Sequence, residues 1–178
     1  MKSSLPVLKG TAALLAALGV VVGVGGPSGA QPLEVPAGHC VYYEATKVTT
    51  CQSTLAQSIQ AADSGAGLAV AVLYGWVNYN STGPTMVISV SRGDCSLTTG
   101  TPDNPQKDYR FPTMPPNWND AVASVSTELP NGSHCDVWFS SNAGFEGECG
   151  DNQWIHKNPN LMHMTYPCYQ RASSFELS

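Results

Sequence analysis

Six cysteines are the residues of this chain whose chemistry is easiest to assign. Their even number predicts three disulfides in an oxidising compartment, for which fifteen pairings are possible. No CxxC motif is present to favour a metal site or a catalytic thiol, which is the competing interpretation. A disulfide that closes a loop of about a dozen residues is worth roughly 3 kcal/mol in the chain-entropy model. Local spacing favours two of the bridges and elimination leaves the third: Cys40–Cys51, Cys135–Cys149 and Cys95–Cys168.

Histidines are the second group that could hold a metal. His156 and His163 stand seven residues apart, while His134 and His39 lie elsewhere in the chain. A zinc site needs ligands that share one face, with further ligands nearby. Because His156 leads into a turn at Pro159, we expect His156 and His163 to lie on different strands. The expectation is therefore surface or hydrogen-bonded histidines.

Paired carboxylates could support hydrolysis, and the chain has two pairs, Glu146/Glu148 and Asp94/Asp103. The two glutamates are two residues apart, so in a strand they would point to one solvated face. Neither a Gly-x-Ser-x-Gly elbow nor a His-Glu-x-x-His motif is present. We therefore expect no catalytic residue and no enzyme activity. An extracellular enzyme of an unrecognised type is the remaining alternative.

The first thirty residues have the composition of a signal peptide. Lys2 and Lys9 form a basic start, residues 11–24 are almost wholly apolar, and small residues precede a cleavage point after Ala30. The apolar run is too short and too rich in glycine for a membrane span, and no cysteine near Ala30 could carry a lipid. We expect the mature protein to be secreted and extracellular, without a membrane anchor.

The mature chain is acidic. Once Lys2 and Lys9 leave with the signal peptide, six basic residues face thirteen acidic ones, so the net charge falls from −5 to −7. Such a surface is a poor partner for nucleic acid and for anionic membranes.

The N-terminal elements that must position these residues are a hairpin and a helix. Residues 41–44 and 47–50 are rich in β-formers, and a two-residue turn between them would set Cys40 opposite Cys51. The helix follows, with Thr54 as its cap and Gln57 closing a capping box. Leu55, Ile59 and Ala62 share the apolar face of this helix, and Gly65 is expected to end it.

The remainder of the chain reads as short strands separated by turns, which indicates a sandwich or a barrel. Nothing favours a parallel sheet with crossover helices, and residues 95–116 resemble a long loop. The expected strands are 69–74, 86–90, 109–111, 122–127, 136–139, 153–156, 161–165 and 173–177.

Two aromatic segments, each followed by a small polar segment, suggest a duplicated β unit. The clearer opening has Phe139, Phe145 and Gly147, and its closing segment is Tyr-Gln-Arg-Ala-Ser-Ser at residues 169–174. The glycine would take a backbone angle that other residues avoid, while the two aromatic rings pack together. The fainter copy has Tyr74 and Tyr79, Ser81 in place of the glycine, and Asn-Asp-Ala-Val-Ala-Ser at residues 119–124.

These segments resemble the βγ-crystallin Greek-key motif, which opens with Tyr-x-x-x-x-x-Phe-x-Gly and closes with Asn/Asp-Asn/Asp-x-x-Ser/Thr-Ser. The resemblance implies an all-β fold in which two Greek-key motifs form a βγ-crystallin-like sandwich. Its expected organisation is a signal peptide (1–30), an N-terminal hairpin and helix extension (31–67) and the crystallin-like domain (68–178). The leader and the cysteines are similar to those of small secreted bacterial proteins of this fold, a group that includes metalloproteinase inhibitors.

The resemblance also implies a calcium site, because the family's closing motif supplies hard oxygen ligands. The first copy keeps Asn119 and Asp120 but has Ala123 where the hydroxyl ligand should be, and the second keeps Ser173. Sites in this family are shared between the two motifs, so Asp120 and Ser173 could form a partial site for Ca²⁺. The alternative is a structural remnant in which Ser124 and its counterpart in the second copy only make hydrogen bonds within the fold. No other cofactor is expected.

Tryptophans could form a sugar- or protein-binding face, or they could simply pack in the sandwich. Trp76 and Trp154 are the better surface candidates because each has polar neighbours, whereas Trp118 and Trp138 carry no such signal.

The function that these features favour is non-catalytic binding, with inhibition of a metalloproteinase as its most specific form. The expected partner is an extracellular protease or another secreted protein. A rigid loop held by a disulfide could occupy a protease cleft at little ordering cost, either within residues 135–149 or within 95–116. The alternative is a structural or stress protein of the envelope with weak or vestigial calcium binding.

Overall fold

The computed structural model describes residues 37–64, 67–91, 109–133 and 135–178. The expected signal peptide and Cys95 lie outside these residues. Within the part of the chain that is described, no helix is long and apolar enough to cross a membrane.

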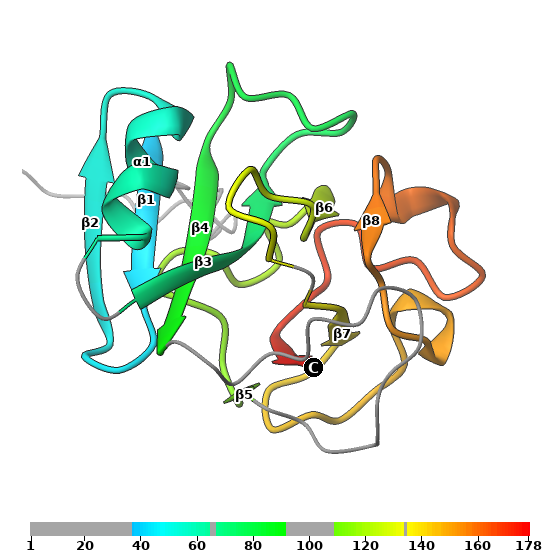
Figure 1. The fold of residues 1–178 in the computed structure, drawn as a ribbon. Coiled ribbons are helices and arrows are strands. Elements are labelled where there is room, and N and C mark those ends of the chain that lie inside the picture. Colours follow the sequence, from blue (N-terminus) through cyan, green and yellow to red (C-terminus); the bar gives the residue numbers. More distant parts are fainter. Residues whose placement is uncertain (1–36, 65–66, 92–108, 134) are drawn as a thin grey trace, which may run out of the picture. The chain divides into compact units, whose positions relative to one another are not determined.

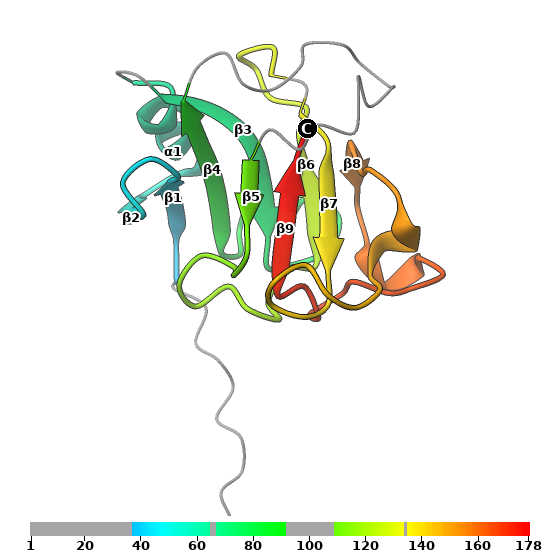
Figure 2. The ribbon, with the colours of Figure 1, turned by 90° about the horizontal axis from the view of Figure 1, so that it is seen from below.

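Among the described residues, two β-sheets and one short α-helix make up most of the regular structure, as expected for an all-β fold. The larger sheet has the strand order β2-β1-β4-β3-β6-β8, and the smaller sheet has the order β5-β9-β7. Figure 2 shows β5, β9 and β7 lying in front of β4, β3 and β6, so the sheets form two layers. The strands are β1 His39–Tyr43, β2 Val48–Gln52, β3 Gly67–Tyr74, β4 Thr85–Ser91, β5 Tyr109–Phe111, β6 Ser124–Ser126, β7 Val137–Ser140, β8 Lys157–Asn158 and β9 Ser174–Leu177.

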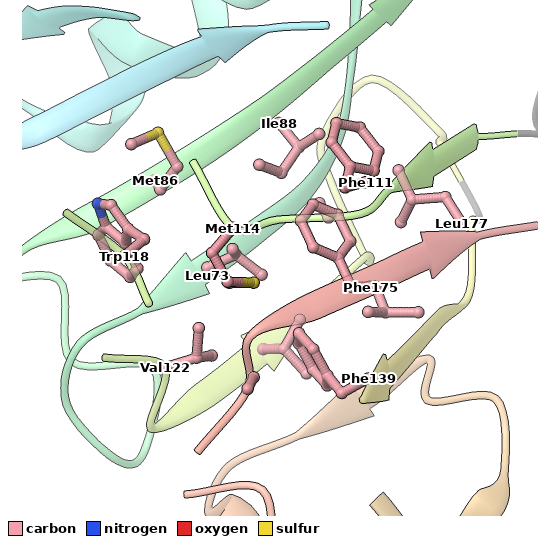
Figure 3. Close-up of a cluster of buried hydrophobic side chains, with 14 of the residues drawn as sticks. Leu73, Met86, Ile88, Phe111, Met114, Trp118, Val122, Phe139, Phe175 and Leu177 are labelled. Atoms are coloured by element: carbon pink, nitrogen blue, oxygen red, sulfur yellow. The ribbon is translucent and has the colours of Figure 1, made fainter. Parts of the chain in front are cut away.

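The main hydrophobic core lies between the two sheets. Phe111 and Phe175 of the smaller sheet stack at 4.2 Å between ring centroids, and Leu73 and Ile88 of the larger sheet are fully buried in the same cluster (Figure 3). Burying one side chain of this size is worth roughly 1.5–3 kcal/mol. The core therefore fastens the small sheet to the large one.

The α-helix, α1 (Leu55–Ala62), begins where the sequence predicts. Thr54 is its N-cap and accepts a hydrogen bond from the backbone N–H of Gln57 at 3.2 Å. The capping box is not closed, because the Gln57 side chain accepts instead from the hydroxyl of Ser53 at 2.6 Å. The helix ends at Ala62, and Gly65, the residue expected to stop it, lies outside the described residues.

Helix α1 covers the outer face of the larger sheet, on the side away from the main core (Figure 1). Ala62 is fully buried there in a second cluster with Val41 and Val72. The hydroxyl of Ser89 on β4 donates to the Ala62 carbonyl at 2.9 Å and ties the helix end to the sheet. The helix thus packs over a face of the sheet.

The β1–β2 hairpin confirms one predicted disulfide. Antiparallel pairing sets Cys40 directly opposite Cys51, and the two are bonded. The connection is longer than the two-residue turn expected, because it runs from residue 44 to residue 47 and Lys47 has a φ of 57°. Ala-Thr lacks the residues that tolerate positive φ at both positions of a tight hairpin turn, so the chain uses a wider one.

The same hairpin gives the larger sheet a parallel pairing, which no signal in the sequence indicated. Strand β1 pairs in parallel with β4, and the chain reaches β4 only after β2, α1 and β3. The hairpin is therefore built into the larger sheet beside β4, and residues 33–178 form one compact unit.

The second predicted disulfide, Cys135–Cys149, is wrong, and so is the Cys95–Cys168 bridge that followed by elimination. Cys149 is bonded to Cys168, and Cys135 is also disulfide-bonded. The segments on either side of the observed bridge are paired, since Gly150 N–H donates to the carbonyl of residue 166 at 2.8 Å. This pairing brings together cysteines 19 residues apart, so closeness in the sequence was a poor guide.

Two predicted strands near the C-terminus are also wrong. Residues 161–165 begin with a 3-10 turn, Leu161–His163, which is capped by the Asn160 side chain accepting from Met162 N–H at 3.1 Å. Residues 153–156 contribute only an isolated bridge at Ile155, and the strand lies just beyond them at β8. Local asparagine side chains compete here with strand pairing for the backbone N–H groups.

Candidate functional site

The first copy of the duplicated unit comprises residues 74–83 and 118–124. Ser124 is fully buried, and its hydroxyl donates to the Trp76 carbonyl at 2.7 Å while accepting from Tyr79 N–H at 3.3 Å. The rings of Tyr74 and Tyr79 meet edge to face at 5.7 Å. One serine therefore holds a folded-over hairpin closed by bonding to two of its backbone groups.

The second copy, residues 140–149 and 168–174, repeats this arrangement. The Ser174 hydroxyl donates to the Asn142 carbonyl at 2.6 Å and accepts from Phe145 N–H at 3.1 Å. The hydrogen bonds expected of the closing serines are thus present in both copies.

Strand register shows which residues of the two copies correspond. Tyr74 pairs with Ser124 in the first copy, and Ser140 pairs with Ser174 in the second. Tyr74 therefore corresponds to Ser140 rather than to Phe139, which corrects the spacing read from the sequence. The interval from Tyr74 to Tyr79, which looked one residue short, therefore equals the interval from Ser140 to Phe145 in the second copy.

The closing segments of the two copies bond reciprocally to each other. Asp120 N–H donates to the Ala172 carbonyl at 3.0 Å, and Gln170 N–H donates to the Val122 carbonyl at 2.9 Å. Asp120 and Gln170 both have positive φ, 56° and 50°, in corresponding places. The two copies are thus related by an approximate twofold, and we call this pair of hydrogen bonds the reciprocal crossing.

The oxygen ligands expected for calcium lie at the reciprocal crossing. The Ser173 hydroxyl donates to Asp120 Oδ1 at 3.3 Å, so the two residues predicted to share a site are neighbours although they are 53 positions apart. Asn119 donates its amide N–H to Asp120 Oδ2 at 2.8 Å, so in this arrangement its nitrogen, not its oxygen, faces the carboxylate. The residues at the corresponding places of the other half are Gln170 and Ala123, and Ala123 has no hydroxyl.

The donor set at the crossing is limited. Asp120 and Ser173 would offer a carboxylate and a hydroxyl, both hard oxygen ligands, and backbone carbonyls would have to supply the others. Among the described residues no group of three His, Cys, Asp or Glu side chains could hold a metal ion. The residues fit at most one weak site on one side of the twofold.

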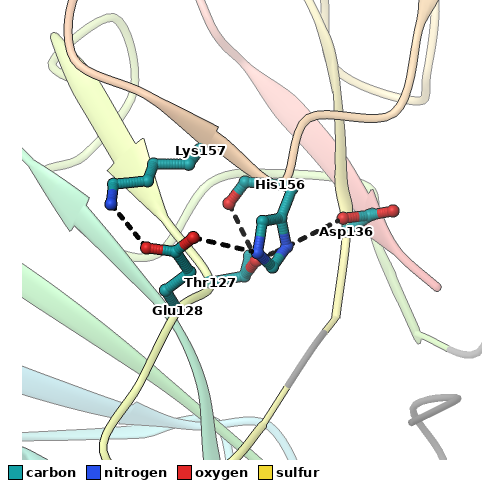
Figure 4. Close-up of polar contacts among 5 residues, drawn as sticks. All are labelled: Thr127, Glu128, Asp136, His156 and Lys157. Carbon is teal, nitrogen blue, oxygen red and sulfur yellow. Dashed lines mark hydrogen bonds and ion pairs between the residues drawn. The ribbon is translucent and has the colours of Figure 1, made fainter. Parts of the chain in front are cut away.

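A polar cluster that the sequence did not predict surrounds His156 (Figure 4). Its Nδ1 lies 2.9 Å from the Thr127 hydroxyl and 3.3 Å from Asp136 Oδ1, and its Nε2 lies 3.5 Å from Glu128 Oε1. Lys157 pairs with the same glutamate. His156 is therefore a hydrogen-bonded histidine, as expected, but its partners come from the segments directly after β6 and directly before β7, which no local signal could identify.

Two carboxyl groups of this cluster have shifted pKa values. Burial raises the pKa of Asp136, and the charge of His156 opposes that rise. A hydrogen bond from Lys157 lowers the pKa of Glu128.

The cluster lacks the geometry of a catalytic triad. In a triad the acid and the nucleophile lie at different nitrogens of the histidine. Here the Thr127 hydroxyl and the Asp136 carboxylate both face Nδ1, so these two groups cannot flank the imidazole. Glu128 does face the other nitrogen, Nε2, at 3.5 Å, but the Thr127 hydroxyl donates its proton to the His156 carbonyl at 2.8 Å and not to the ring.

The four tryptophans differ in their exposure to solvent, and Trp76 is exposed as the sequence predicts. Trp76 is 50% exposed, whereas Trp118 is fully buried in the main core. Trp154 is half-buried, and its ring meets that of Trp138 edge to face at 5.6 Å. Of the two surface candidates, Trp76 presents the larger free surface.

An exposed loop of the second copy, residues 141–148, stands between β7 and the Cys149–Cys168 bridge. Its backbone is held internally by Asn142 N–H donating to the Glu146 carbonyl at 2.9 Å, and its neighbour Arg110 lies over the Phe145 ring at 4.3 Å. We call residues 141–148 the anchored loop.

Comparisons with known proteins add one likeness. No protein-family profile matches the chain, and no curated protein matches it. A βγ-crystallin domain from Flavobacterium johnsoniae is similar in structure, with a TM-score of 0.36 and 17% identity over 61% of this chain and 93% of that domain. The paired hairpins and the reciprocal crossing described above define the class of the fold, which is all-β and built from two related copies.

Proposed function

We propose that the mature chain is a secreted, non-catalytic binding protein, and that its specific activity is inhibition of an extracellular metalloproteinase. The observation that carries this proposal is the anchored loop, which is exposed along most of its length yet fixed at both ends. A loop that is already ordered loses little conformational entropy when it enters a cleft. The disulfides are consistent with an oxidising compartment.

The support beneath the anchored loop is rigid. Phe145 is bonded through its N–H to the buried Ser174, and its ring is covered by Arg110. Arg110 is itself fixed by an ion pair of 2.8 Å with Glu176, whose side chain is almost fully buried. The exposed residues Ala143 and Glu146 are thereby presented from a fixed base.

The test is inhibition of a panel of secreted proteases, with a thermolysin-type metalloproteinase first. The oxidised mature protein is expected to inhibit stoichiometrically and to lose inhibition after reduction and alkylation. Ala143→Arg should abolish inhibition, because it adds bulk at an exposed position of the anchored loop. Ser81→Arg is the matched control, since Ser81 is exposed in the corresponding loop of the first copy.

Absence of inhibition at micromolar concentration across the panel would overturn the inhibitor proposal. If the parent inhibits and Ala143→Arg inhibits equally well, the anchored loop is not the contact.

A second candidate is a structural protein of crystallin type that calcium tightens. The observation that favours it is the closeness of Asp120 and Ser173 at the reciprocal crossing. A cation bound there would bridge the two motif copies and so stabilise the folded state by mass action.

A further inference from the structure

The fold itself does not require an aromatic side chain at Trp76. The residue at the corresponding place in the second copy is Asn142, and both residues use only their backbone carbonyl to accept from the closing serine. Trp76 nevertheless exposes half of its large apolar surface to solvent. An exposed indole that the hairpin does not need calls for an explanation outside folding.

The Trp76 ring packs directly against the backbone at Gly83. A Cβ added at Gly83 would lie within 3.0 Å of three ring atoms at the fused edge of the indole, so only glycine lets the ring lie down on the backbone. Gly83 has no positive φ and thus no conformational need to be glycine. Its counterpart in the second copy is Cys149. The pair Trp76 and Gly83 therefore forms a platform with one ring face on the backbone and the other toward solvent.

The residues that follow Trp76 in the same loop, up to Gly83, are neutral and largely polar. Asn80 Oδ1 accepts from the N–H and the hydroxyl of Thr82, at 2.9 and 2.7 Å, which directs the Asn80 amide nitrogen away from these contacts. The exposed side chain of Asn78 makes no hydrogen bond to the described residues. The sequence has no charged residue from 64 to 91. Lys157, which lies over the Tyr79 ring, is neutralised by its ion pair with Glu128.

We propose that Trp76, seated on Gly83, is the platform of a carbohydrate-binding site for a neutral polysaccharide of β-1,4-linked pyranose units. The face of an indole ring is negative, and the flat face of an equatorially substituted pyranose presents weakly positive C–H groups, so the two stack favourably. Side-chain amides such as those of Asn78 and Asn80 both donate to and accept from sugar hydroxyls. A neutral loop fits a neutral saccharide better than an acidic one.

The test measures binding of the mature protein to cellohexaose and chitohexaose by titration calorimetry, and its depletion from solution by insoluble cellulose and chitin. At least one of these neutral ligands is expected to bind the parent. Trp76→Asn installs the residue of the second copy, so the fold should persist while the affinity falls by about tenfold or more. Gly83→Ala should weaken binding as well, because it displaces the ring.

Tyr166→Ala is the matched control, because Tyr166 is an aromatic residue of similar exposure (43%) in another loop. Circular dichroism and thermal melting establish that each variant is folded. In the parent, the indole N–H signal of Trp76 should also move in nuclear magnetic resonance spectra when the oligosaccharide is added, which tests the site without any variant.

The proposal is overturned if no neutral saccharide binds. It is equally overturned if Trp76→Asn binds like the parent, if Tyr166→Ala weakens binding as much as Trp76→Asn, or if the Trp76 signal stays still on addition of a ligand that binds. Protease inhibition is measured separately, so this outcome does not depend on that of the inhibitor assay.

Discussion

At the scale of single residues, Asp136 is a carboxyl group whose surroundings favour its neutral form. Its side chain is only 12% exposed, and its Oδ1 accepts no hydrogen bond from the described residues. The facing group is His156 at 3.3 Å, which compensates the carboxylate fully only when the imidazole is protonated. The ionised form of Asp136 is therefore a buried charge that its surroundings compensate poorly.

Asp136→Asn should increase the stability of the folded protein at pH 7 more than at pH 3.5. The pKa of Asp136 is raised by folding, so its contribution favours the folded state below the unfolded value of about 3.9 and is lost as pH rises through the folded value. Asparagine has the same shape and never ionises, so it avoids that loss. Urea denaturation at the two pH values measures the difference, and an equal effect at both would contradict the role assigned to burial.

Asp120 is the residue on which calcium binding depends. Millimolar Ca²⁺ should raise the melting temperature of the parent, and Asp120→Asn should remove that rise because it removes the only charged ligand of the pair. Asparagine tolerates the positive φ at this position, so the backbone is not strained further. Gln170→Asn, at the corresponding place, is the control and should keep the response. A calcium response that survives in Asp120→Asn would refute the site.

At the scale of elements, each folded-over hairpin depends on one buried hydroxyl. Ser124 and Ser174 are both fully buried, and each makes one hydrogen bond as donor and one as acceptor within its own copy. The hairpins are therefore closed by side chains in addition to strand pairing.

Ser124→Ala and Ser174→Ala should each lower the free energy of unfolding by about 1–3 kcal/mol, because each leaves a backbone carbonyl and an N–H without their partner. The two losses should be similar, since the serines occupy corresponding places. Chemical denaturation measures both, with the exposed Ser81→Ala as a control within about 0.5 kcal/mol of the parent. A loss in only one of the two variants would show that the copies are not equivalent in energy.

At the scale of the whole molecule, the N-terminal hairpin completes the larger sheet. Strand β1 covers one edge of β4, and α1 covers the outer face of the sheet through Val41, Ala62 and Val72. Removal of residues up to 67 would expose both this edge and this face to water. A free edge of that kind also pairs readily with other chains.

A chain that begins at Leu68 should therefore fail to fold cooperatively or should aggregate, whereas a chain that begins at Leu33 should melt like the mature protein. Size-exclusion chromatography and thermal melting of the two oxidised proteins test this expectation. A soluble fragment from Leu68 with a single cooperative transition would instead confirm the domain boundary expected from the sequence.

Local signals in the sequence were sufficient for some of these features and not for others. Thr54 and the Cys40–Cys51 pair act within a dozen residues, so composition and spacing could predict the cap and the bridge. The Cys149–Cys168 bridge, the parallel pairing of β1 and the contact of His156 with Asp136 depend on how distant segments cross. The closeness of Asp120 and Ser173 was predicted only because the family that the sequence resembles shares its sites between the two motifs.

The reciprocal crossing has a consequence for how such a chain can evolve. It joins the two copies through backbone N–H and carbonyl groups alone, so it places few demands on the side chains at positions 120 and 170. One copy carries aspartate there and the other glutamine, while a tryptophan platform is present in only one of the two hairpins. A duplicated fold whose two copies cross through main-chain hydrogen bonds can thus change the side chains at the crossing in one copy while the other copy stays as it is.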